Sequence, residues 1–268
     1  MDAMIPAMVA VLPYAAKETD RPVLNGVSVS LGKEMLIAAG DGHRMGLKTL
    51  PLSFKEDRSV IFPRGSVSSL EFLWKKTGRM PPLDGTLVSV IIAKKHAHVA
   101  FDGKQGMRFR FGEGTTVVVK LVQGDPPAWG KLIPKKDPIL QVQFFAAELE
   151  RAIKRISASG ANMVKLAFRE DFAIISAKAE DQEMESTIPI HITKGDPNEM
   201  GLSPQYLLDY LKGKEGVIIR SWEGDTSPVV LSHGTTPRVL IMPMKLGEKK
   251  EASVAAESKA ETSPDASP

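Results

Sequence analysis

Residues 239–246 read VLIMPMKL, and the interpretation of the whole chain starts from this stretch. It begins as an apolar strand, turns at Pro243 and places Met242 and Met244 beside a single charge, Lys245. Methionine is unbranched and polarizable, so it suits surfaces that accept several partners. The same residues also fit a last core strand in which the methionines fill gaps. The stretch alone leaves a binding surface and plain core packing both open.

The composition is that of an ordinary globular chain. Of the 268 residues, 43% are apolar and 25% are charged, which is enough to bury a sizeable core. The chain contains no cysteine, which excludes disulfides, thiol chemistry and cysteine-based zinc sites. No apolar run approaches the roughly 18 residues of a membrane span, and the N-terminus lacks a signal-peptide pattern. We therefore expect a cytoplasmic protein.

The net charge of +3 is an average over two unlike parts. Residues 247–268 carry three lysines and five acidic residues, a charge of −2, so the preceding body carries +5. This C-terminal tail is rich in Ala, Ser, Glu and Lys and has no aromatic residue, so we expect it to be disordered. A modestly basic body permits nucleic-acid binding without implying it.

Apolar residues at helical spacing predict four helices. The first covers residues 7–18, where Pro13 should kink or shorten the helix. The last begins with Ser203 as its cap and Pro204 in its first turn. The apolar faces of the second, third and fourth helices are, in that order, Val67, Leu70, Leu73 and Trp74; Phe145, Leu149, Ala152, Ile153 and Ile156; and Leu207, Leu208 and Leu211.

Short apolar or alternating runs between these helices predict strands. The pattern of a helix followed by strands repeats along the chain and gives four units, each with one helix and about four strands. Such a pattern indicates an α+β fold with antiparallel sheets. The Gly- and Pro-rich segment at 124–130, which contains Trp129, is a natural domain boundary. The predicted strands are 23–30, 35–39, 47–52, 59–62, 87–93, 96–101, 107–111, 116–122, 140–144, 163–168, 172–177, 185–190, 216–221, 228–231 and 238–242.

Four motifs, in the right order and at matching intervals, resemble the bacterial sliding clamp, the β subunit of DNA polymerase III. RPVLNGV at 21–27 and AAGDGHRM at 38–45 resemble the family's R-x-x-L-N-G strand and its A-x-D-G-H-R-L-like strand end. SVIFPR at 59–64 leads into a helix, and PPAWGKLIPK at 126–135 looks like the family's last linker. The stretch VLIMPMKL is similar to the family's closing M-P-M-R strand. The resemblance covers about residues 7–246 and only the family's second and third domains.

The resemblance implies a DNA-clamp fold. Two domains, each built from two helix-plus-antiparallel-sheet repeats, would place helices inside, around a central hole, and sheets outside. We expect these domains at residues 1–125 and 138–246, with a linker at 126–137 and the tail at 247–268.

The resemblance also implies a peptide-binding pocket between the two domains. In the family it takes short hydrophobic peptides from polymerases, the clamp loader and repair proteins. An apolar cleft with cations at its rim suits such peptides, although Leu24 and Leu240 fit plain core packing equally well. Carried over onto the matching positions, the pocket comprises Leu24, Gly40, Gly42, His43, Arg44, Met45, Pro127, Lys131, Leu132, Pro228, Leu240, Met242, Pro243, Met244 and Lys245.

Double-stranded DNA is the second partner that the resemblance implies. Cations on inner helices would meet phosphates without reading bases, which gives weak, salt-sensitive and sequence-neutral contact. Each of them also fits an ordinary solvated helix face. The DNA-facing candidates are Lys17, Arg21, Arg64, Lys75, Lys76, Arg151, Lys154, Arg155, Lys212 and Lys214.

An enzyme is the less favoured alternative. Asp41 and His43 flank Gly42, and His96 and His98 share one strand face, so pieces of a hydrolase or metal site are present. No third ligand at motif spacing, no G-x-S-x-G and no P-loop accompanies them. We therefore expect no catalytic residue, no metal and no cofactor.

The assembly is the point at which the chain departs from the family. The bacterial clamp closes as a dimer of three-domain chains, which makes six domains. Three copies of a two-domain chain would also make six, so we expect a homotrimeric ring, closed by head-to-tail contacts. The competing hypothesis is a clamp-like module that binds clamp-interacting peptides, or modulates a host clamp, without encircling DNA.

Overall fold

The structure is a computed structural model of the chain, and it describes residues 3–17, 20–53, 57–77, 106–111, 115–179, 182–223, 227–234 and 237–246. The strands predicted at 87–93 and 96–101 and the tail at 247–268 lie outside these ranges. Among the helices within them, none is long and apolar enough to span a membrane.

Pro13 shortens the first helix, as predicted. Helix α1 spans Met4–Val11, and the chain continues as a 3₁₀ turn, η1 (Leu12–Tyr14). A proline inside an α-helix removes a hydrogen bond and clashes with the preceding turn, so the α-helix ends before Pro13. The helix also begins earlier than predicted.

The remaining elements of the first half follow the predicted order, but two strands begin three residues away from their predicted starts. The strand expected from residue 47 starts three residues earlier, at Arg44. The strand expected from residue 23 starts only at Gly26, because residues 22–24 form a second 3₁₀ turn, η2 (Pro22–Leu24), in which Pro22 fixes φ. The other elements are β1 (Gly26–Leu31), β2 (Met35–Gly40), β3 (Arg44–Leu50), β4 (Arg58–Pro63), α2 (Arg64–Thr77), β5 (Gly106–Phe111) and β6 (Thr115–Lys120).

The second half begins after a short helix in the expected linker, α4 (Trp129–Leu132). Two strands of four residues each, β11 and β12, were not predicted. The elements are β7 (Leu140–Phe145), α5 (Ala146–Ser157), β8 (Val164–Phe168), β9 (Phe172–Ala179), β10 (Gln182–Pro189), β11 (His191–Lys194), β12 (Glu199–Leu202), α6 (Pro204–Leu211), β13 (Gly216–Ser221), β14 (Val229–Ser232) and β15 (Arg238–Ile241).

Two details of the predicted helices are wrong. Phe145 was expected on the apolar face of a helix, but it ends β7 and its side chain is 69% exposed. The strand alternation that buries Phe144 turns Phe145 to the opposite side. Ser203 does occupy the N-cap position of α6, but its side chain makes no capping hydrogen bond.

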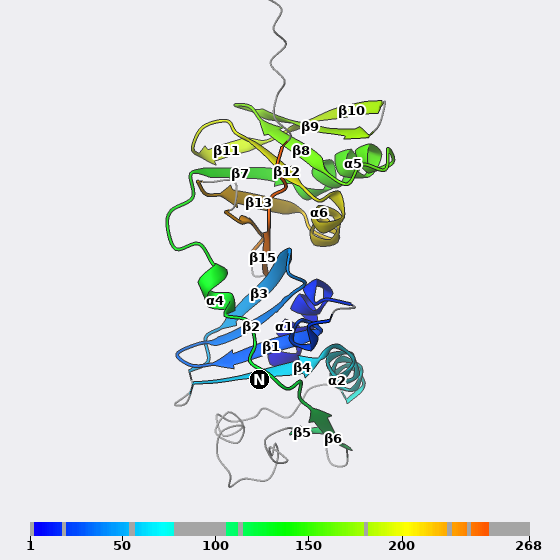
Figure 1. Cartoon of the computed structure of the whole chain (residues 1–268), viewed down its shortest axis with the longest axis vertical. Coiled ribbons are helices and arrows are strands. Elements are labelled where there is room, and N and C mark those ends of the chain that lie inside the picture. The colour runs from blue at the N-terminus through cyan, green and yellow to red at the C-terminus, as the bar shows by residue number, and fades with distance from the viewer. Residues whose placement is uncertain are drawn as a thin grey trace, which may run out of the picture.

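One antiparallel sheet runs through both halves of the molecule. Its strand order is β11-β7-β13-β14-β15-β3-β2-β1-β4, and the halves meet where β15 pairs with β3. In that pair Leu240 lies opposite Met45 and Val239 lies opposite Gly46. The halves are therefore joined by strand hydrogen bonds in addition to the linker (Figure 1).

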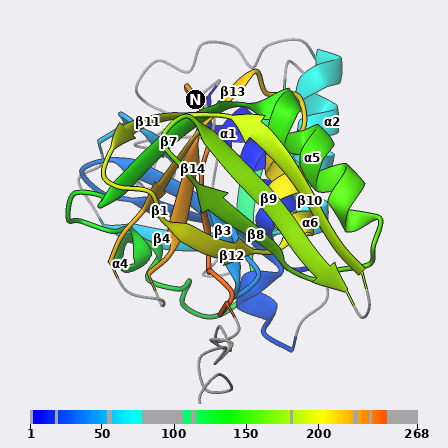
Figure 2. The same cartoon turned by 90° about the horizontal axis from the view of Figure 1, so that it is seen from above.

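Helices α1, α2, α5 and α6 gather on one side of the molecule. A four-stranded antiparallel sheet, β10-β9-β8-β12, completes the second half, and α5 packs against β9 and β10 and beside α6. In the first half, α1 packs against α2. In both views these two helix pairs lie on the same side of the molecule (Figures 1 and 2).

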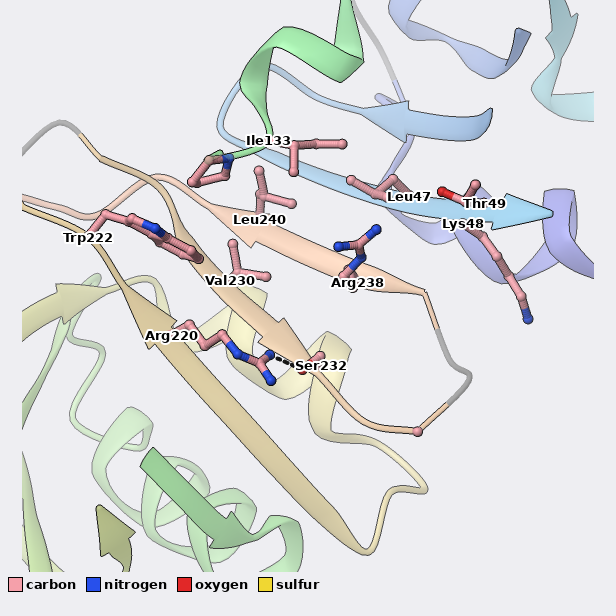
Figure 3. Close-up of a pocket in the computed structure, with 12 residues that line it drawn as sticks. Leu47, Lys48, Thr49, Ile133, Arg220, Trp222, Val230, Ser232, Arg238 and Leu240 are labelled. Atoms are coloured by element: carbon pink, nitrogen blue, oxygen red, sulfur yellow. Dashed lines mark hydrogen bonds between the residues drawn. The ribbon is translucent and has the colours of Figure 1, made fainter. Parts of the chain in front are cut away.

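Three clusters of buried apolar side chains hold these layers together. One fills the first half, and a second fills the second half. The third lies across the junction and includes Leu47 of β3 and Leu240 of β15, from neighbouring strands (Figure 3). Burial of each such side chain contributes about 1.5–3 kcal/mol, so the junction is apolar as well as hydrogen-bonded.

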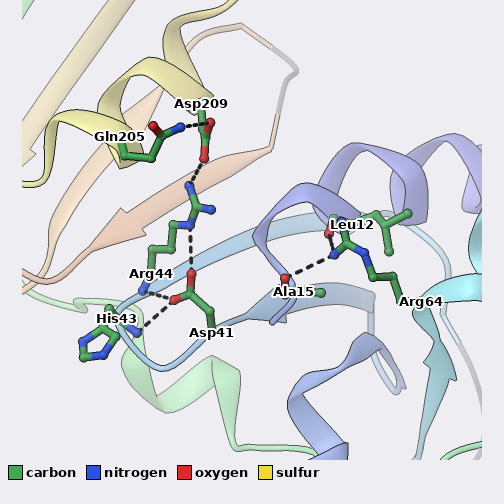
Figure 4. Close-up of polar contacts among 8 residues, drawn as sticks. All are labelled: Leu12, Ala15, Asp41, His43, Arg44, Arg64, Gln205 and Asp209. Carbon is green, nitrogen blue, oxygen red and sulfur yellow. Dashed lines mark hydrogen bonds and ion pairs between the residues drawn. The ribbon is translucent and has the colours of Figure 1, made fainter. Parts of the chain in front are cut away.

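Arg44 joins the halves on the other side of the same sheet (Figure 4). Its Nε donates to Oδ2 of Asp41 at 3.0 Å, and its Nη1 donates to Oδ2 of Asp209 in α6 at 2.6 Å. Its guanidinium carbon lies 4.3 Å from the ring centroid of Tyr206, within cation–π range. With its side chain only 9% exposed, Arg44 is a largely buried tie between β3 and α6.

Tyr14 completes this contact from the first half. Its side chain packs with the core of the second half, and its ring lies 5.6 Å from the Arg44 guanidinium. Burial, the largest cause, raises the pKa values of Tyr14 and Tyr206, so both remain neutral phenols at physiological pH. Gly46 provides the space, because a Cβ there would lie 2.2 Å from Cδ2 of Tyr14.

We predict that Gly46→Ala lowers the free energy of unfolding by about 1–3 kcal/mol, because the added methyl group would displace Tyr14. Chemical denaturation monitored by circular dichroism measures this change. Gly65→Ala is the matched control, since a Cβ at Gly65 has open space and alanine favours the helix. Equal destabilisation by both substitutions would contradict the prediction.

We predict that Arg44→Met lowers the free energy of unfolding by about 2–4 kcal/mol, because two partly buried carboxylates lose their cation. The same denaturation measurement applies. Lys194→Gln removes the exposed ion pair with Asp137 and should cost less than about 1 kcal/mol. A loss for Arg44→Met no larger than that of the control would mean that Arg44 does not tie the halves together.

Candidate peptide and DNA interfaces

The apolar residues predicted for the peptide pocket come together around a residue that the prediction omitted. Leu24, Met45 and Leu240 belong to one cluster with Trp129, the first residue of α4. They are 7%, 3% and 4% exposed, and Trp129 is 6% exposed. A Cβ at Gly40 would lie 3.0 Å from the Trp129 ring, so the glycine lets the indole approach the sheet. The apolar groups thus meet beneath the linker.

Trp129 was detectable in the sequence as the aromatic residue of the predicted boundary segment. Nothing in the pattern indicated that it would point inward. The three linker residues that were predicted for the pocket lie closer to the surface: Pro127 is half-buried, and Lys131 and Leu132 are exposed, Leu132 by 53%.

Met242 and Met244 are the exposed apolar part of the predicted set, at 42% and 39%. The backbone N–H of Met242 donates to the His43 carbonyl at 2.9 Å, and that of Met244 donates to the Gly201 carbonyl at 2.8 Å. These bonds carry the chain from the start of β3 to the edge strand β12, with Pro243 between them. The segment is held at its backbone and presents both thioethers.

A hollow of about 430 Å³ adjoins this segment. Pro243, Met244 and Lys245 line it, together with Met200 and Val229. Pro228 is half-buried directly before β14. The predicted pocket residues therefore fall into a buried cluster around Trp129 and a more open surface at residues 242–245.

The D-G-H-R turn has a structural role in the described molecule. Oδ1 of Asp41 accepts hydrogen bonds from the backbone N–H groups of His43 and Arg44, both at 3.0 Å. Gly42 has a φ of +101°, which suits glycine. The Arg44 guanidinium points to the junction between the halves, whereas the imidazole of His43 is exposed. His43 and Lys245, which were predicted for the pocket together with Arg44, remain on the surface.

The cations predicted to face DNA divide into two groups. The first group is exposed to solvent, but several of its members have carboxylate neighbours. Lys75 pairs with Glu71 at 2.6 Å, and Lys154 pairs with Glu150 at 2.6 Å. Arg151 pairs with Glu148, and Arg155 donates to Ser186 Oγ at 3.2 Å. Lys76 lies over the Phe72 ring at 4.8 Å. Lys17, Arg21 and Lys212 are exposed.

Arg64 and Lys214 face inward more than was predicted. Arg64 Nη1 donates to the carbonyls of Leu12 at 3.0 Å and Ala15 at 3.2 Å, which fixes the end of the α1–η1 segment on α2 (Figure 4). Lys214 donates to the Tyr210 carbonyl, and burial lowers its pKa. Both side chains are therefore engaged by the protein itself.

Net charge differs between the two helix pairs. Helix α2 carries Arg64, Lys75 and Lys76 against Glu71, while α1 is uncharged. Helices α5 and α6 carry three cations and three carboxylates, so together they have no net charge. The positive character of the helix side comes from the first half.

The structure offers no metal site in the ranges that it describes, where no three potential ligands among His, Asp and Glu are grouped. His96 and His98 lie outside those ranges. Asp41 and His43 were considered as pieces of a hydrolase site. The Asp41 carboxylate instead accepts hydrogen bonds from two backbone N–H groups and from Nε of Arg44.

Comparisons with known proteins agree with the fold. Residues 4–127 match the family of the DNA polymerase III beta subunit, central domain. The chain is 28% identical over 246 residues to the beta sliding clamp of Bacillus subtilis, which covers 88% of this chain and 60% of that protein. It is 24% identical over 243 residues to the beta sliding clamp of Rickettsia bellii, covering 83% of this chain and 59% of that protein. The chain thus spans about 60% of the length of these relatives.

Solved structures show the same fold. The DNA polymerase III beta subunit of Thermotoga maritima superposes with a TM-score of 0.72 at 20% identity, covering 91% of this chain and 64% of that one. The Caulobacter crescentus pol III beta superposes with a TM-score of 0.73 at 19% identity, covering 91% and 65%. This family is non-enzymatic. The chain has the α+β clamp fold and is a homologue of the bacterial beta sliding clamp that corresponds to two of its three domains.

Proposed function

We propose that this protein is a sliding clamp, a processivity factor in DNA replication that holds its partners on duplex DNA. The observation that carries the proposal is the junction cluster. The L-N-G, D-G-H-R, linker and M-P-M-K motifs, which are far apart in the sequence, each supply a residue to one apolar site between the halves or to its edge. A site assembled in this way suits the apolar side chains of a short peptide.

The proposed partners are a replicative polymerase and its clamp loader, which would bind at this junction in the cytoplasm. Met242 and Met244 offer exposed, adaptable contacts beside the buried cluster. Lys245 and His43 supply polar contacts at its edge. Arg44 supports the site from behind by fixing β3 on the second half.

Duplex DNA would pass along the helix side. Lys75 and Lys76 of α2 and the cations of α5 would meet phosphates without reading bases. Helix α2 carries three cations against one carboxylate and α5 three against two, and this small positive excess suits weak contact, which sliding requires.

A ring of three copies is the proposed assembly. Three two-domain chains would supply six domains, and head-to-tail contacts close into a ring when the rotation permits it.

A clamp-like module that binds clamp-interacting peptides without encircling DNA is the second candidate. The neutral surface of α5 and α6 favours it, because encircled phosphates attract cations on every inner helix.

We predict that Met242→Asp combined with Met244→Asp weakens binding of a clamp-interacting peptide at least about tenfold, because two apolar contacts become charged. Fluorescence anisotropy with a labelled peptide measures the affinity. Val118→Asp, which alters an exposed residue of β6 that is 52% accessible, is the control and should leave the affinity unchanged. If the double variant binds as tightly as the unaltered protein, the proposed pocket is wrong.

We predict a particle of about 87 kDa, three times the chain mass of 29.1 kDa, in light scattering at low and moderate salt. The same assembly should stay on closed circular duplex DNA and leave it when the circle is linearised. A particle of 29.1 kDa at both salt concentrations would exclude a self-assembled ring and favour the peptide-binding module.

A further inference from the structure

A second hollow lies beside the junction cluster, on the same face of the sheet (Figure 3). Its volume is about 670 Å³, and strands β3, β13, β14 and β15 contribute to it. Leu47, Val230 and Leu240 form its apolar floor, and Ile133 of the linker and Trp222 add apolar walls. The site has the size and apolar lining of a ligand pocket.

The charged residues that line this hollow are all cations. Lys48, Arg220 and Arg238 line the hollow, and no acidic residue is among its described lining residues. Within the described part of the chain, neither Lys48 nor Arg238 forms an ion pair. Arg220 donates to Gln141 Oε1 at 2.7 Å and to Ser232 Oγ at 2.6 Å, so neutral groups hold it in place. The Lys48 side chain points away from the hollow (Figure 3), so Arg220 and Arg238, with no carboxylate among the described lining residues, form its site for an anionic group.

The walls of the hollow are fixed by contacts of their own. Trp222 Nε1 donates to the Lys136 carbonyl at 2.7 Å, which ties the linker to the end of β13. Leu240 belongs both to this hollow and to the cluster that contains Leu24 and Met45. A peptide seated at the junction cluster can therefore continue into the hollow without leaving the protein surface.

The combination of an apolar floor with a cationic rim favours a peptide over a nucleic acid backbone. Phosphates are met by cations on open surfaces and gain nothing from buried leucine and valine side chains. An acidic peptide uses both features, because an apolar side chain covers the floor while neighbouring carboxylates pair with the rim.

We propose that this hollow binds the acidic flank of a clamp-interacting peptide, with carboxylates paired to Arg238 and Arg220. The inference rests on the proposed function and adds the chemistry of the partner: acidic residues next to the apolar anchor.

Two fluorescein-labelled peptides test this inference. Both carry the same Leu-Phe anchor, followed in one by two glutamates and in the other by two glutamines. Anisotropy titrations use the full chain and its Arg238→Gln, Lys48→Gln and Lys178→Gln variants. Lys178 is an exposed lysine of β9, in the other sheet, and controls for the general loss of one positive charge. A short duplex DNA serves as the competing anionic probe.

The expected result is that the unaltered protein prefers the glutamate peptide, and that Arg238→Gln weakens its binding about three- to tenfold. Binding of the glutamine peptide should not change in any variant. Lys48→Gln, next to the hollow but facing away from it, and Lys178→Gln should have little effect on either peptide. Equal binding of both peptides to every protein would overturn the inference while leaving the proposed pocket intact. Binding of neither peptide would overturn both. Loss of duplex DNA binding in Arg238→Gln, with peptide binding unchanged, would make the hollow a nucleic-acid site and overturn the inference.

Discussion

The pairing of β3 with β15 is the contact on which the rest of the structure depends. It joins two separate cores into one sheet, and it places Leu240 opposite Met45 on the face that carries the candidate pocket. The opposite face of the same junction carries Arg44 with Asp209, and Tyr14 against Gly46. The pairing is thus supported by apolar packing on one face and by a charged, aromatic contact on the other.

Local pattern was enough to predict much of the fold. The position of Pro13 predicted the early end of the first helix. The helical spacing of apolar residues predicted the faces of α2 and α5 that pack against the core, apart from Phe145. The strands that escaped prediction, β11 (HITK) and β12 (EMGL), are four residues long and too short to display a clear alternation. Phe145 was misassigned because the last residue of a strand and the first of a helix share one apolar run.

The candidate site was predictable only in part, because sequence motifs indicate which residues belong to it but not which distant residues contact one another. The motifs indicated Leu24, Met45 and Leu240, which do meet in one cluster. The partner of Arg44 lies 165 residues away in α6, and no spacing rule reveals such a pair. The inward position of Trp129 likewise depends on Gly40, which is distant in sequence and leaves room for the ring. The contact of Arg44 with Asp209 and the burial of Trp129 therefore depend on the tertiary structure.

The uninterrupted sheet has a consequence for how the molecule bends. Strands in a sheet are rotated against their neighbours by a twist of about 20–25°, so the angle between the halves is set by hydrogen bonds and twist at β15 and β3. A hinge at the linker would allow that angle to vary. Here the angle within each copy is fixed by its own backbone, so any larger arc that several copies form can change its radius only at the contacts between copies.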